Sequence, residues 1–176
     1  MGSINSPPPV LLILAAFSRY PEALAWAQEK ATAAWGPMLL ASEPFAFEET
    51  GYYERTMGPQ LRKQFLSFAD RIDPALLPQI KRQTNAWEEE YAALGRHEEP
   101  RPLNLDPGYL TLAKLVLAST KDHAHRIYLS DGIYAEVTLS FRDGAWQAWT
   151  WTFPDYRRED YHAYFVQCRE QVKRSR

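Results

Sequence analysis

The sequence predicts a single α+β domain in which helices pack on a mostly antiparallel sheet. Three observations lead to this prediction. The chain has 176 residues, a length that suits one domain with a substantial core. Val10–Phe17 is a continuous apolar run, typical of a strand buried on both faces. Residues 125–153 hold two turn signals that end in glycine and are flanked by β-branched and aromatic residues, which predicts antiparallel hairpins.

The composition is that of a folded protein and narrows its class. Apolar residues make up 45% of the chain and charged residues 24%. The formal net charge of −2 argues against a general nucleic-acid binder. Cys168 is the only cysteine, so no internal disulfide is possible, and we expect a cytoplasmic protein. No apolar run reaches the roughly 18–20 residues that span a bilayer, so no membrane association is predicted.

The first elements follow from local signals. We expect residues 1–9 to be a disordered lead and residues 10–176 to form the domain. After the first strand, Pro21 begins a helix, because proline is tolerated at the first helical position, and Gly36-Pro37 ends it. Met38–Phe47 is expected to be a second strand that Pro44 interrupts or ends.

The next segments complete a recognisable order. Residues 48–59 form a polar and aromatic loop of the kind that is often functional. A third strand is expected around Gln64–Phe68, and Asp73-Pro74 begins a helix that Gly95 ends. With a short strand at Pro102–Leu105, the first half matches a ferredoxin-like split βαβ arrangement.

The second half is predicted to contain two further helices. Asp106-Pro107-Gly108 resembles a helix start with Asp106 as the N-cap, and the predicted helix runs to about Ala118. This segment is apolar nearly all round, so we expect the helix to be buried. Glu159–Arg174 is expected to be a C-terminal helix with Cys168 on its inner face as an unreactive core residue.

The hairpins between these helices allow a prediction of register. A three-residue loop at Ser130-Asp131-Gly132 places Tyr128 opposite Tyr134 and Arg126 opposite Glu136. Read the same way, Arg142-Asp143-Gly144 pairs Val137 with Trp149. The result is a three-stranded antiparallel meander whose last strand extends to Phe153. Its buried face carries Ile127, Leu129, Ile133, Ala135, Val137, Leu139, Gln147, Trp149, Trp151 and Phe153. Its other face is either a solvated sheet or a binding surface, and carries Arg126, Tyr128, Tyr134, Glu136, Thr138, Trp146 and Thr150.

Several long motifs, spread over almost the whole chain, carry a family resemblance. They are Ser42-Glu43-Pro44-Phe45, Tyr52-Tyr53 followed by Met57-Gly58, Asn104-Leu105-Asp106-Pro107-Gly108-Tyr109, Lys114 through Arg126-Ile127-Tyr128-Leu129, residues 132–139, and residues 151–156. In these motifs the chain resembles the bacterial domain-of-unknown-function family 4416. The resemblance implies a bacterial, cytoplasmic protein of one domain, and it implies no activity.

The first functional hypothesis is a binding domain or enzyme for a small anionic ligand that carries phosphate or carboxylate. Its site would contain Lys114, Lys121, His123, Arg126, Tyr128 and Glu136, with the Tyr52-Tyr53 loop as a lid. Arginine suits the bidentate recognition of such groups. Glu136 or His123 would act as acid or base, or Glu136 would hold Arg126 in place. Lys114 has a simpler interpretation as a lysine that reaches solvent from its helix.

Other site types have less support in the sequence. His123 and His125 have the spacing of some metal ligands, but no third His or Cys lies nearby, so no metal site is predicted. The sequence has no Gly-rich phosphate loop and no nucleophile elbow, and it names no cofactor. A second hypothesis is an interaction module whose aromatic sheet face, with Tyr128, Tyr134 and Trp146, binds a protein or RNA. The net charge makes RNA the weaker choice.

Overall fold

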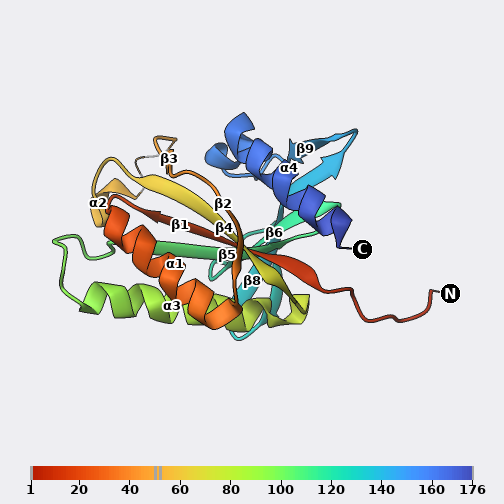
Figure 1. Cartoon of the computed structure of the whole chain (residues 1–176), viewed down its shortest axis with the longest axis horizontal. Helices are drawn as coiled ribbons and strands as arrows, with labels where there is room; N and C mark the ends of the chain where they lie inside the picture. The colour runs from red at the N-terminus through yellow and green to blue at the C-terminus, as the bar shows by residue number, and fades with distance from the viewer. Residues whose placement is uncertain (1, 50, 52, 176) are drawn as a thin grey trace.

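The strands of the chain form one antiparallel sheet, and the longer helices pack on its faces (Figure 1). The computed structural model describes residues 2–49, 51 and 53–175. Its elements are β1 (Val10–Ser18), α1 (Pro21–Trp35), β2 (Met38–Ala41), β3 (Phe45–Ala46), α2 (Glu54–Met57), β4 (Arg62–Ile72), η1 (Pro74–Leu76), α3 (Leu77–Ala93), β5 (Asn104–Leu110), β6 (Lys114–Ser119), β7 (Ile127–Ser130), β8 (Ile133–Arg142), β9 (Ala145–Ala148), η2 (Pro154–Arg157) and α4 (Glu159–Arg174).

The sheet has nine strands within the described residues and a core on each face. The strand order is β2-β4-β1-β5-β6-β8-β7, with β3 paired to β4 and β9 paired to β8. Helices α1 and α3 cover one face and α4 covers the other (Figure 1). Every residue of β1 is buried, which confirms the prediction for Val10–Phe17. Because strand side chains alternate, Leu12 and Leu14 join the α1–α3 core, whereas Leu11 and Ile13 join the α4 core.

Most of the predicted early elements are confirmed. Gly36, at φ 88°, ends α1, since glycine reaches this conformation without strain. Pro44 separates β2 from β3. Asp73 accepts a hydrogen bond from the Ala75 N–H at the start of the predicted second helix. Residues 2–9 are exposed and form no helix or strand.

The helix predicted from Asp106 to Ala118 is wrong, because this segment forms β5 and β6. The short strand expected at Pro102–Leu105 is the beginning of β5. Asp106 does not cap a helix; its side chain contacts Lys81. A mostly apolar run fits a doubly buried strand as well as a buried helix, so periodicity did not distinguish the two.

Strands β5 and β6 pair over three residues and then separate. The pairs are Gly108 with Leu117, Tyr109 with Val116 and Leu110 with Leu115. A Cβ atom on Gly108 would lie 2.2 Å from the Val116 carbonyl oxygen, so the two strands cross at a distance that only glycine allows. Beyond this crossing, the edge of β5 that pairs with β6 has no neighbouring strand at Leu105 within the described residues. The Leu105 N–H donates a hydrogen bond to Glu88 (2.7 Å), and the Leu105 carbonyl accepts one from Lys81 (2.8 Å). Side chains of α3 thus take the place of a neighbouring strand.

Gly108→Ala is expected to lower the free energy of unfolding by about 1–3 kcal/mol, because backbone must move to admit the methyl group. Urea denaturation measures this change. Gly51→Ala is the control, since its Cβ would meet nothing closer than 4.0 Å, and the change there should stay within about 0.5 kcal/mol. Equal stabilities for the two variants would contradict the close crossing.

The first hairpin has the predicted register over most of its length. Tyr128 pairs with Tyr134, as predicted, and Ile127 pairs with Ala135. The loop itself is shorter than predicted: Ser130 pairs with Ile133, and an irregularity at Leu129 absorbs the extra residue. Asp131 and Gly132 have φ values of 52° and 76°, as a two-residue turn of type I′ requires.

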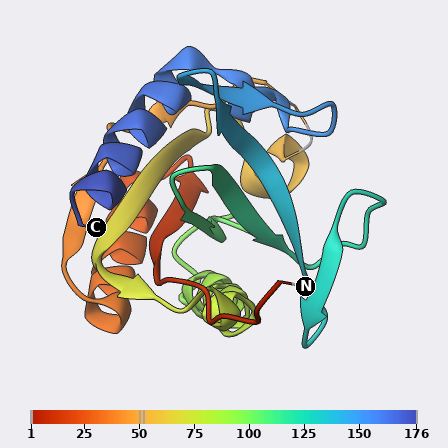
Figure 2. The ribbon, with the colours of Figure 1, turned by 90° about the vertical axis from the view of Figure 1, so that its right-hand side faces the viewer.

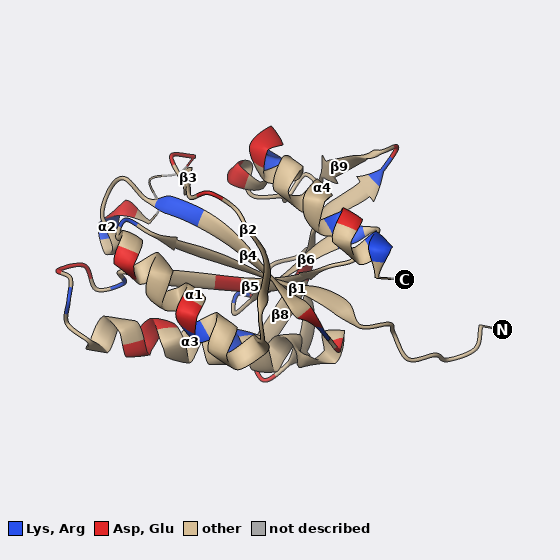
Figure 3. Ribbon diagram, in the orientation of Figure 1, with Lys and Arg blue, Asp and Glu red and all other residues tan. Residues whose placement is uncertain are grey.

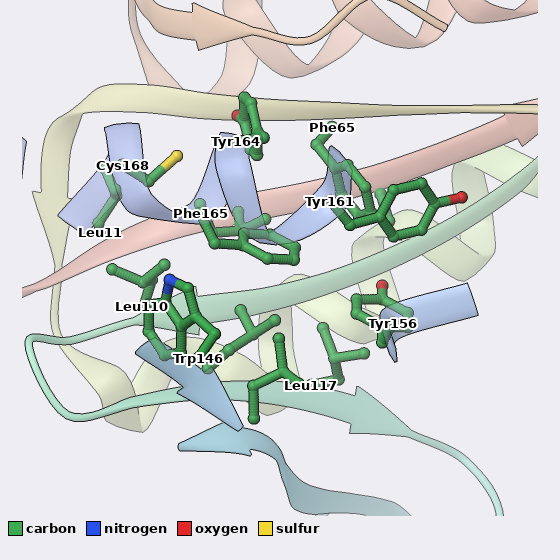
Figure 4. Close-up of a cluster of buried hydrophobic side chains, with 14 residues drawn as sticks. Leu11, Phe65, Leu110, Leu117, Trp146, Tyr156, Tyr161, Tyr164, Phe165 and Cys168 are labelled. Atoms are coloured by element: carbon green, nitrogen blue, oxygen red, sulfur yellow. The ribbon is translucent and has the colours of Figure 1, made fainter. Parts of the chain in front are cut away.

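The predicted register of the second hairpin is wrong by one residue. Phe141 pairs with Trp146 and Arg142 with Ala145, around a two-residue turn at Asp143-Gly144. A one-residue difference moves each side chain to the opposite face. Trp146, predicted on the open face, is therefore 4% exposed and packs in the α4 core (Figure 4).

The predicted meander with one open polar face is also wrong. Ala135 of β8 pairs with Ala118 on one edge and Ile127 on the other, and Leu139 pairs with Leu115 and Ala148. Hence β6 takes one whole edge of β8, while β7 and β9 share the other. The strand expected to reach Phe153 ends at Ala148. On the face predicted to be open, Glu136 and Thr138 are buried, whereas Ile127, predicted to be buried, is 73% exposed.

Candidate functional site

A cavity of about 1030 Å³ lies where β5 and β6 separate. Helix α3 lines it with Lys81, Asn85 and Glu88, and the two strands line it with Asn104, Asp106 and residues 117–119. Phe47, Tyr53 and residues 153–156 complete the lining. Figure 3 shows that an acidic position lies within β5, in the middle of the sheet. Charged side chains in such a place need a physical explanation, because burial of an unpaired charge is costly.

One buried ion pair joins Arg126 to Glu136. Glu136 Oε2 accepts from Arg126 Nε at 2.8 Å and lies 3.1 Å from His125 Nε2, while Oε1 accepts from Thr138 Oγ1 at 3.1 Å. Arg126 Nη1 donates to Ser119 Oγ (2.6 Å) and to the Lys121 carbonyl (3.0 Å). The Arg126 side chain is 3% exposed. Its second terminal nitrogen, Nη2, donates to no residue in the described part of the chain.

A second group of charges connects α3 to β5. Lys81 Nζ lies 3.1 Å from Asp106 Oδ1, and Asn104 Nδ2 donates to Asp106 Oδ2 at 2.9 Å. Burial alone would raise the pKa of Asp106, but the positive charges of Lys81 and Lys63 outweigh it and lower the pKa. Burial raises the pKa of Glu88, against the opposing charge of Lys81. Two carboxyl groups that line one cavity thus have pKa values shifted in opposite directions, a pattern found in acid–base sites.

A third ion pair, Lys63 with Asp155, lines the cavity on the α4 side. Both side chains are 5% exposed. The Lys63 ammonium also lies 4.8, 4.7 and 5.0 Å from the ring centroids of Phe17, Phe47 and Tyr156. These rings are at cation–π distance, so they and Asp155 together compensate the buried charge. Tyr156 itself belongs to the aromatic core of α4 (Figure 4).

The structure brings together five of the residues predicted for the site. Lys121, His123, Arg126, Glu136 and Tyr53 all line the cavity. The predicted Arg126–Glu136 pair is present, but it is buried and not on a solvated sheet face.

Three predicted site residues do not join them. Lys114 is exposed at the start of β6, and the helix expected to direct it does not exist. Tyr128 is 57% exposed and packs edge-to-face on Tyr134, outside the cavity. Tyr52 lies outside the described residues.

Several charged residues of the cavity were not predicted as site residues, among them Lys63, Lys81, Asp106 and Asp155. Two of them left a signal. Lys63 is two residues before Phe65 in a strand, which places both side chains on the buried face. Lys81 follows Leu77 by four positions and so lies on the apolar side of α3. In both cases the sequence shows a charged residue at a position where the periodic pattern predicts an apolar one, which indicates a buried charge.

The described residues give little support to other kinds of site. These residues contain no group of three or more His, Cys, Asp or Glu that could hold a metal ion. None of their helices combines the length and the apolar character that crossing a membrane requires. Cys168 is buried, as predicted, and burial raises the pKa of its thiol to about 11.

Comparison with known proteins identifies a family and nothing more specific. The model of DUF4416, a domain of unknown function, matches residues 8–172. No curated protein and no solved structure matches the chain. The match covers both the cavity and the two cores.

Proposed function

The chain belongs to the DUF4416 family, a domain of unknown function, and we propose that its cavity binds a small anionic ligand that carries a phosphate or carboxylate group. The single observation that carries this proposal is the environment of the Arg126 guanidinium. Its side chain is almost fully buried, three protein acceptors fix its orientation, and Nη2 has no partner among the described residues. A guanidinium held in this way is preorganised for an oxygen anion.

A second cationic residue also favours this end of the cavity. Lys121 lines it together with Arg126, and the Lys121 carbonyl accepts a hydrogen bond from Arg126 Nη1. Among the other acids of the lining, Asp106, Asp155, Glu88 and Glu49 each pair with a lysine or arginine. An anion beside Arg126 would therefore lie near two cationic residues of the lining.

Inorganic phosphate is expected to stabilise the protein against thermal unfolding, by about 2.7 kcal/mol at a hundredfold excess over its Kd. Arg126→Lys keeps a positive charge beside Glu136 but removes the planar fork, so its affinity for phosphate should fall by at least about tenfold, or about 1.4 kcal/mol. Calorimetric titration measures both proteins. Lys114→Ala, at an exposed lysine away from the cavity, is the control and should bind like the wild type. Unchanged affinity in Arg126→Lys would contradict the proposal.

The exposed edge strand β7 favours a second candidate function, the binding of a protein partner. Ile127, Tyr128 and Leu129 are 73%, 57% and 39% exposed. Figure 2 shows this strand, in cyan, at the edge of the sheet and away from its centre. An exposed apolar edge strand offers unpaired backbone groups to another chain. Trp146 takes no part in such a surface, because it is buried.

We also propose finer assignments for the fold and the setting of the protein. The antiparallel order β5-β1-β4-β2, with α1 and α3 on the same face, supports a ferredoxin-like arrangement of the first half. The resemblance to a bacterial family supports a bacterial protein. The single cysteine, buried and without a disulfide, supports the cytoplasm as its location.

A further inference from the structure

Four aromatic rings form a nearly parallel stack that ends at the cavity. Trp149 and Trp151 are separated by 5.1 Å between ring centroids, with 2° between their planes. Trp151 and His125 follow at 5.5 Å and 11°, and His125 and His123 at 5.8 Å and 11°. These distances lie within the range of favourable aromatic pairs.

The stack is open at the His123 end. His123 is exposed, is the last ring of the stack, and lines the cavity together with Arg126. The two middle rings of the stack are held in place by polar contacts. His125 Nε2 contacts Glu136, and Trp151 Nε1 donates to the Val137 carbonyl at 3.1 Å. The chain therefore presents one flat ring, already aligned, beside its candidate anion site.

We propose that the anionic ligand is a nucleotide, whose base continues the stack on His123 while its phosphate binds Arg126. This inference rests on the proposed anion site and adds the class of the ligand. Base stacking on aromatic side chains needs only a planar ring and tolerates any base. The chain lacks a Gly-rich phosphate loop, so the phosphate would be held by side chains and not by a row of backbone N–H groups.

The rest of the cavity suits the polar remainder of such a ligand. Asn85, Asn104 and Glu88 line the wall that α3 and β5 form. Amide and carboxylate groups can bond the hydroxyl groups of a sugar or the edge of a base. The volume of about 1030 Å³ is at the upper end of the range for small-molecule sites, so a nucleotide fits within it.

Calorimetric titration with four probes tests the proposal: inorganic phosphate, ribose 5-phosphate, adenosine 5′-monophosphate and adenosine. The nucleotide is expected to bind at least about tenfold more tightly than ribose 5-phosphate, which lacks the base. His123→Ala should reduce nucleotide affinity to the level of ribose 5-phosphate and leave ribose 5-phosphate binding unchanged. His123→Phe keeps a flat ring and should retain most of the gain. Tyr128→Ala, at an exposed ring outside the cavity, should change nothing.

The outcomes separate this inference from the proposed function. Equal affinity for the nucleotide and ribose 5-phosphate would overturn the stacking inference and leave the anion site standing. The same would follow if His123→Ala kept the full nucleotide affinity. Failure of all three phosphates to bind would overturn the anion site, and the stacking inference with it.

Discussion

Glu136→Ala is expected to destabilise the protein by about 3–5 kcal/mol, because it leaves the guanidinium of Arg126 buried without its carboxylate. Both side chains of this pair are almost fully buried, at 3% and 1% exposed. The same substitution leaves Thr138 Oγ1 without its acceptor. Urea denaturation, with midpoint and slope both measured, gives the change in the free energy of unfolding.

The double variant Arg126→Gln with Glu136→Gln is the matched control for this loss. It removes both charges but keeps hydrogen-bonding groups of similar size, so much of the stability should return. Phosphate binding should not return, since the guanidinium is absent. A loss below 1 kcal/mol in Glu136→Ala would mean that Arg126 does not depend on Glu136 for its place.

Asp155→Ala is expected to have an effect of similar size, about 3–5 kcal/mol, because it leaves the Lys63 ammonium buried without a carboxylate. The rings of Phe17, Phe47 and Tyr156 offset part of this cost, so the lower end of the range is expected. Lys63→Met combined with Asp155→Leu removes both charges and should recover most of the stability. The measurement is again urea denaturation.

An exposed ion pair provides the comparison for Asp155. Arg158 and Asp160 lie 2.6 Å apart, but the Asp160 side chain is 45% exposed. Asp160→Ala should therefore cost less than about 1 kcal/mol. Equal losses of stability in Asp155→Ala and Asp160→Ala would contradict the claim that Asp155 compensates a buried charge on Lys63.

Elements with a local signal were predicted well from the sequence. The apolar run of β1, proline and glycine at the ends of α1, and the Asp73 cap each depend on a few neighbouring residues. The segment from Asp106 to Ala118 has a misleading local signal, because Asp106-Pro107-Gly108 resembles a helix start and the apolar run after it fits a buried strand or a buried helix. The crossing at Gly108 that decides between them involves β6 and is not visible in β5 alone.

The candidate site divides in the same way. The contact of Arg126 with Glu136 spans ten positions within one hairpin, and the register predicted for that hairpin places the two residues opposite each other. Lys63 and Asp155 are 92 positions apart, and only the packing of η2 against β4 brings them together. Trp146 shows how little separates the two cases: one residue of turn length moved it from a predicted binding surface into the core.

The most direct test of the central claim is the position of the phosphate group in a crystal structure of the protein with ribose 5-phosphate. The phosphate is predicted to lie in the cavity, with one oxygen within hydrogen-bond distance of Arg126 Nη2 and the Ser119–Arg126–Glu136 contacts intact. A phosphate bound away from Arg126, or an empty cavity at a concentration that saturates binding in solution, would contradict the claim.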